Sequence, residues 1–114
     1  MTKALDILTT HYQRQVGQSF VVPGVTNEDG EPFTIYFDPP TNRQAQTIRG
    51  RAGTDEAKLT LYTVIYLAKD KDGNRLFEDN AETVQGLTES VSGAVLGQMA
   101  AAIMKVSDLE DLGN

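Results

Sequence analysis

The chain of 114 residues has no cysteine and no tryptophan, and His11 is its single histidine. Without cysteine, disulfides and thiolate metal sites are excluded. Catalytic triads and histidine-based metal sites need more partners than one histidine can supply. His11 also falls within an amphipathic segment, where a partly exposed helix residue is the expected role. We therefore expect that the protein is not an enzyme and that it uses neither a cofactor nor a metal ion.

Long apolar runs and excess positive charge are also missing. No apolar run approaches the ~20 residues of a membrane-spanning helix. The first ten residues lack the basic region and following apolar stretch of a secretory signal. The formal net charge of -6 disfavours unspecific binding to nucleic acid. We therefore expect partners that are neither membranes nor nucleic acids.

One segment departs from the acidic balance of the chain. Arg43, Arg49 and Arg51 lie together, with no acidic residue between Thr41 and Gly53. Two interpretations remain open: a solvated helix face, which is the more common role of such a run, and a site for an anionic partner.

The hydrophobic pattern predicts a single domain of the α+β class, mostly helical, over residues 1–114. With 39% hydrophobic residues, the chain can form a core without disulfides. Glycine and proline residues separate segments whose apolar spacing is either helical or alternating. These segments are a helix at 3–16, a β-hairpin at 18–38, and helices at 41–49, 55–68 and 80–105. A lone hairpin is marginally stable in water. We therefore expect the N-terminal hairpin to pack on a small helical bundle with a long C-terminal helix.

Local signals support these assignments. Phe33, Ile35 and Phe37 occupy alternate positions, which is typical of a half-buried strand. Thr41 and Gln44 have the spacing of a capping box at the start of a helix.

The run 59–68 is ambiguous, because its residues have high strand propensity. Its apolar side chains also follow a helical spacing, and the cap signal of Thr54, Asp55 and Glu56 precedes it. The length of the run and the cap favour a helix.

The segment 80–105 carries an apolar stripe and a series of small residues. The stripe runs from Val84 to Val106 at helical spacing. The small residues recur every three or four positions: Gly86, Ser90, Gly93, Gly97 and Ala101. A glycine inside a helix costs about 1 kcal/mol relative to alanine, so these glycines indicate a use. Two uses remain open: close packing on the chain's own helices, and a helix–helix or subunit interface formed by these five residues.

The spacing Asp70-x-Asp72-x-Asn74 invites comparison with a calcium-binding loop. An EF-hand loop needs glycine at its sixth position and a bidentate acid at its twelfth. Here glycine stands at the fourth position and Ala81 at the twelfth. The segment is therefore predicted to be a polar turn between two helices.

Several segments resemble the small tail assembly chaperones of long-tailed phages and prophages. The likeness centres on 57–79, where an apolar helix is followed by a turn of the form D-x-D-G-x-x-L-F. That turn reads Asp70-Lys71-Asp72-Gly73-Asn74-Arg75-Leu76-Phe77 here. The hairpin strands Phe20-Val21-Val22-Pro23 and Phe33-Thr34-Ile35-Tyr36 and the closing Leu109-Glu110-Asp111-Leu112-Gly113-Asn114 are also similar, so the resemblance covers most of 18–114.

The chain departs from that family in three places. Gly24-Val25 stands where the family often has tryptophan-glycine, and the helix after the hairpin opens with Thr41-Asn42-Arg43-Gln44 instead of acidic residues. The helix at 3–16 is an addition of this chain.

The resemblance implies a helper protein of tail assembly. Such chaperones bind the tape-measure protein and keep it soluble until tail tube subunits assemble around it. The implied partners are therefore the tape-measure protein and the tail tube protein, in the cytoplasm of the bacterial host and outside the mature virion. Many members also have a longer, frameshifted form, in which case Asn114 would end the short form. A homo-oligomer is a further expected assembly, and the client-binding residues stay unassigned.

Two other functions remain open at this stage. One is a structural subunit of the phage tail or of the head–tail joint. The other is an acidic adaptor or regulator unrelated to tails.

Overall fold

The computed structural model describes the backbone of residues 3–113 and the side chains of residues 3–105, so Asn114 lies outside the described residues. Over this range the chain forms five helices and one two-stranded antiparallel sheet. The elements are α1 (Lys3–Gln15), β1 (Gln18–Thr26), β2 (Pro32–Phe37), α2 (Asn42–Ala52), α3 (Glu56–Leu67), α4 (Ala81–Glu89) and α5 (Gly93–Gly113). The predicted class is confirmed: an N-terminal hairpin is followed by a mostly helical bundle with a long C-terminal helix.

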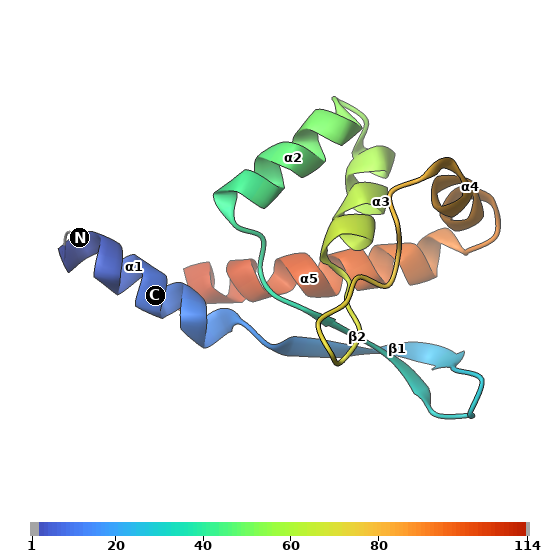
Figure 1. Cartoon of the computed structure of the whole chain (residues 1–114), viewed down its shortest axis with the longest axis horizontal. Coiled ribbons are helices and arrows are strands. Elements are labelled where there is room, and N and C mark those ends of the chain that lie inside the picture. The colour runs from blue at the N-terminus through green and yellow to red at the C-terminus, as the bar shows by residue number, and fades with distance from the viewer. Residues whose placement is uncertain (1–2, 114) are drawn as a thin grey trace.

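The hairpin forms one side of the molecule, and α5 lies between it and the helices α2 to α4 in Figure 1. Its strands pair antiparallel, with Phe20 opposite Ile35, and the register becomes irregular beyond Val21. Ile35, Phe37 and Val22 are buried, as the alternating pattern predicts for the second strand. The hairpin therefore presents an apolar face to the helical bundle.

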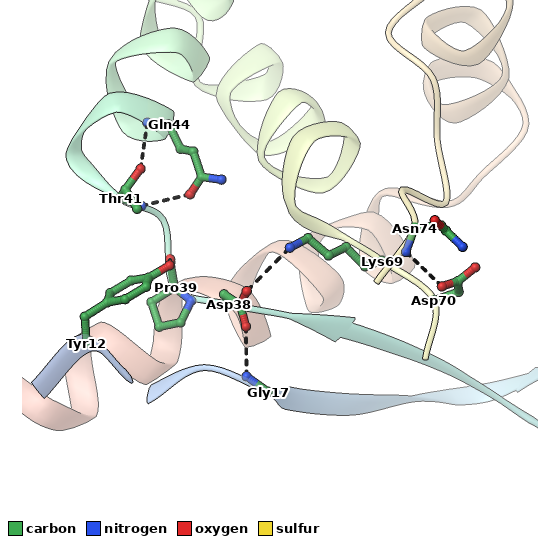
Figure 2. Close-up of polar contacts among 9 residues, drawn as sticks. All are labelled: Tyr12, Gly17, Asp38, Pro39, Thr41, Gln44, Lys69, Asp70 and Asn74. Carbon is green, nitrogen blue, oxygen red and sulfur yellow. Dashed lines mark hydrogen bonds and ion pairs between the residues drawn. The ribbon is translucent and has the colours of Figure 1, made fainter. Parts of the chain in front are cut away.

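Helix α2 begins at the predicted capping box (Figure 2). The Thr41 hydroxyl accepts from the Gln44 backbone N–H at 3.2 Å, and the Gln44 side chain accepts from the Thr41 N–H at 2.9 Å. The helix continues to Ala52, beyond the predicted end at 49, because Gly50 stays helical and the chain turns only at Gly53, where φ is +63°. A glycine weakens a helix without ending it, and burial of Ala52 favours the extra turn.

The ambiguous run is helical from Leu59 to Leu67, which confirms the prediction made against its strand propensity, and Ala68 is the extended C-cap that ends the helix one residue before the predicted end. Asp55 caps α3, since its carboxylate accepts from the Ala57 and Lys58 backbone N–H groups. The helix then passes through the centre of the core, with Val64 and Ile65 fully buried. It packs against α2, α4 and α5. Burial on several sides explains why β-branched residues are used in a helix here.

The predicted single helix at 80–105 is wrong, because two helices occupy this segment. Helix α4 ends at Glu89. Its C-cap, Ser90, donates its N–H to the Gly86 carbonyl, and its φ of -119° and ψ of 2° are no longer helical. Ser92 then caps α5, its hydroxyl accepting from the Val95 N–H at 3.2 Å. Serine competes with helix hydrogen bonds through its side chain, so two serines so close together favour a stop and a new start. The apolar spacing continues across this break and conceals it.

Among the residues that the structure describes, no helix is long and apolar enough to cross a membrane.

Candidate functional site: an apolar groove between three helices

A groove opens between α2, α3 and α5, and it is called the groove from here on. Its volume is about 330 Å³. The described residues that line it are Pro40, Ala45, Ile48, Arg49, Leu59, Thr60, Thr63, Gly97, Ala100, Ala101 and Met104. Arg49 is the one charged residue in this set. The groove is thus an apolar surface open to solvent, with a cation on its border.

The floor and the rim of the groove differ in exposure. Ile48, Thr63 and Ala100 on the floor are buried. The Thr63 hydroxyl donates to the Leu59 carbonyl at 2.7 Å, so it offers no unsatisfied polar group to a ligand. At the rim, Met104 is 45% exposed, so its apolar side chain is accessible to a ligand. The geometry therefore suits an apolar ligand surface held by packing.

Small side chains create this hollow. Gly97 and Ala101 lie one turn apart on α5, so they line the same side of that helix. Ala45 on α2 contributes a third small residue. Larger side chains at these positions would fill the space between the helices.

The five predicted interface residues do not share one face. Gly97 and Ala101 line the groove. Gly86 and Ser90 belong to the end of α4 and line a different hollow, beside Leu76 and Phe77. Gly93 begins α5 and lines a third hollow, between α3, α4 and α5. The break after α4 causes this separation, and two of the five predicted residues remain together at one candidate site.

Close packing on the chain's own helices does not explain the glycines. A methyl group added at Gly86, Gly93 or Gly97 would meet no atom within 4 Å beyond its immediate surroundings in the chain. The space beside each of them is open. The interface interpretation of Gly97 and Ala101 stays a prediction, and the groove gives it a place.

Two of the three arginines of α2, Arg49 and Arg51, have different surroundings, and Arg43 is exposed. Arg49 lines the groove, whereas Arg51 donates to an Asp79 carboxylate oxygen at 2.9 Å and lies 4.9 Å over the Tyr62 ring. The Tyr66 hydroxyl donates to the other Asp79 oxygen. This bond and the Arg51 guanidinium lower the pKa of Asp79 below its ordinary value. Asp79 thereby ties the end of α2 to α3, and the neighbouring Asn80 caps α4 by accepting a hydrogen bond from the Thr83 N–H.

The predicted polar turn at 70–74 is confirmed. Asp70 Oδ1 accepts from the Asp72 N–H at 2.9 Å and from the Asn74 N–H at 3.0 Å, the second bond being drawn in Figure 2. Gly73 has φ +88°, which glycine adopts without strain. The bond from Asn74, followed by that from Asp72, lowers the pKa of Asp70. Within the described residues, no group of three or more His, Cys, Asp or Glu side chains could hold a metal ion.

The sequence does not predict the groove, because the residues that line it come mostly from three separate helices.

Comparison with protein-family models, with curated proteins and with solved structures gave no match for this chain.

Proposed function

We propose that the protein is a tail assembly chaperone of a long-tailed phage or prophage, which binds the tape-measure protein and keeps it soluble until tail tube subunits assemble around it. The observation that carries the proposal is the apolar groove between α2, α3 and α5. The resemblance of 18–114 to that family supplies the identity of the client.

The groove fits the kind of ligand that this function requires. A tape-measure protein is long and helical, and its apolar face must be covered before the tube forms. Amphipathic helices bind in apolar grooves through side chains that recur every three or four residues. A cavity of about 150 Å³ can hold benzene, so the groove volume of about 330 Å³ accommodates more than one apolar side chain of a helix.

The opening of the groove to solvent suits a temporary complex. Tube subunits have to displace the chaperone, so each contact must be weak and many copies must act together. Affinity follows the quality of anchoring contacts more than contact area. A groove with a single charged border residue, Arg49, provides packing without a buried ion pair. The net charge of -6 would keep a coated client from associating with itself.

The proposal is tested by co-expression with the tape-measure protein of the same gene cluster. The soluble fraction of the client is measured alone, with the wild-type chain, and with Ala101→Arg, which places a long charged side chain in the groove. Gln98→Arg is the matched control, because Gln98 is exposed on the same helix and does not line the groove. The wild type and the control should solubilise the client, and Ala101→Arg should not. A client that stays insoluble with the wild type would contradict the proposal.

The second candidate is a structural subunit of the phage tail or of the head–tail joint. The feature that favours it is α1, which extends away from the body in Figure 1 and exposes apolar side chains, as arms between virion subunits do. Mass spectrometry of purified particles separates the two functions. A chaperone should be missing from mature particles, whereas a structural subunit should be present in many copies.

A further inference from the structure

Arg49 carries a positive charge on the border of the groove. Its side chain is exposed, and the other residues that line the groove are uncharged. In the part of the chain that the structure describes, ion pairs join Arg51 to Asp79 and Lys69 to Asp38, and none involves Arg49. The groove thus combines an apolar floor with one cation that no described acidic side chain neutralises.

The wall of the groove that α2 forms is basic, although the whole chain is acidic. Helix α2 carries Arg43, Arg49 and Arg51, and no acidic residue stands between Thr41 and Gly53. Charges farther apart than about 8 Å are largely screened at physiological ionic strength. The net charge of -6 therefore does not by itself decide which ligands the groove accepts.

The position of Arg49 along α2 relates it to the hollow part of the groove. Ala45 stands four positions earlier and lines the same groove, so the two residues lie on one side of α2, about 6 Å apart along its axis. Residues three or four positions apart on a client helix have a similar separation. A client helix that lies along α2 and fills the space beside Ala45 therefore brings a residue one turn away level with Arg49.

Arginine suits such a border position. Its apolar stem can lie against apolar surface while the guanidinium stays in water. The guanidinium donates two parallel hydrogen bonds to a carboxylate, which a lysine side chain cannot do. A ligand rich in phosphate fits less well, because the rest of the lining offers no further charge.

We propose that the groove selects an amphipathic client helix with aspartate or glutamate three or four residues from its apolar anchor, and that Arg49 pairs with this carboxylate. The inference rests on the proposed function, since it assigns the chemistry of the same client. Charge pairs at the border of an interface fix the register and reject wrong partners more than they add affinity. Arg49 is thus a specificity-determining residue, and a client helix with lysine at the same place is rejected.

Four fluorescein-labelled peptides of about 20 residues test the selection, each an amphipathic helix with the same leucine stripe. Three of them carry glutamate, glutamine or lysine both three residues before and three residues after the central leucine, so that either direction of the helix brings one beside Arg49. The fourth has glutamine at these places and two glutamates on the opposite, polar face. Fluorescence anisotropy gives the Kd of each peptide for the full-length chain.

We expect the wild type to bind the first glutamate peptide about fivefold more tightly than the glutamine peptide and about tenfold more tightly than the lysine peptide, as exposed charge pairs allow. The peptide with glutamates on its polar face should bind like the glutamine peptide. In about 1 M salt, where the screening length is about 3 Å, the preference should shrink.

Two variants assign the preference to Arg49. Arg49→Glu should reverse the order, so that the lysine peptide binds most tightly, and Arg49→Gln should erase the order. Arg43→Glu is the matched control, because Arg43 is exposed on the same helix, does not line the groove and undergoes the same change of charge. It should keep the wild-type order. Circular dichroism should show that all three variants fold.

Three results would overturn the inference. Equal affinity of the wild type for all four peptides, or no binding of any of them, excludes selection by the groove. An order that persists in both Arg49 variants would assign the preference to other residues. A reversal by Arg43→Glu as large as that by Arg49→Glu would assign it to the overall charge of α2.

The proposed function fails in a different experiment. A chain that solubilises the tape-measure protein but binds the four peptides equally would keep the proposed function and lose the selection by Arg49. A chain that shows the predicted order of peptides but leaves the tape-measure protein insoluble would keep the selection and lose the proposed client.

Discussion

Replacing Gly97 with leucine tests whether the groove binds the client and whether its small residues keep that space open. Gly97 is in the second turn of α5, and a methyl group there would meet no atom within 4 Å beyond its immediate surroundings in the chain. The leucine side chain should therefore enter the groove without displacing neighbouring helices. We expect Gly97→Leu to stabilise the protein and, at the same time, to abolish client binding.

The size of the stabilisation follows from two terms. Leucine is about 0.8 kcal/mol more favourable than glycine inside a helix. Burying a leucine side chain fully contributes about 1.5–3 kcal/mol, and a half-open groove gives less than half of that after the loss of rotamer freedom. The free energy of unfolding should rise by about 1–1.5 kcal/mol, which corresponds to about 4–6 °C in Tm for a chain of this length.

Urea unfolding followed by far-ultraviolet circular dichroism measures this change, because the chain has no tryptophan for fluorescence. Gly93→Leu is the control. Gly93 is the first residue of α5 and lies outside the groove, so its replacement should change stability less and leave client binding intact.

A loss of stability in Gly97→Leu would contradict this prediction. It would mean that α5 needs glycine for close packing at this position, which is the alternative that the open space argues against. A stabilised Gly97→Leu variant that still binds the client as tightly as the wild type would place the binding site elsewhere.

Three further predictions concern the framework of the groove. Thr41→Ala removes the capping box of α2 and should lower the free energy of unfolding, measured in urea, by about 1 kcal/mol. No change would mean that water satisfies the Gln44 N–H equally well. Ile65→Ala opens a cavity at a fully buried site of α3 and should lower the free energy of unfolding by about 3–4 kcal/mol. A decrease below about 1 kcal/mol would contradict this prediction. Asp79→Asn removes a carboxylate whose pKa is lowered by Tyr66 and Arg51, so the ionised form stabilises the folded state. That contribution is present above the unfolded pKa of about 4 and is lost as pH falls through the folded value. The wild type should therefore exceed Asp79→Asn in stability at pH 7 and approach it below pH 4, and a constant difference would exclude this origin.

Features that depend on neighbours in sequence could be predicted. The capping box at Thr41, the Asp70 turn and the Asp55 cap each use residues within four positions of one another. The alternation around Ile35 set the second strand in the same way. Local hydrogen bonds decide such features, so they are readable without knowledge of the rest of the fold.

Features that depend on distant residues could not be predicted. The stop between α4 and α5 is hidden by apolar spacing that continues across it, and Ser92 decides it through one side-chain bond. The groove joins Ala45, Leu59 and Ala101, which no sequence spacing relates. The role of Asp79 depends on Arg51, which lies 28 positions away. In each case the deciding partner is brought near only by packing of the helices.

We propose that the groove holds an apolar helix of a tape-measure protein. The most direct measurement is the soluble fraction of that protein when it is co-expressed with the wild-type chain, with Ala101→Arg and with Gln98→Arg. We expect a soluble complex with the wild type and Gln98→Arg, and an insoluble client with Ala101→Arg. Equal solubility with all three chains, or with none, would contradict it.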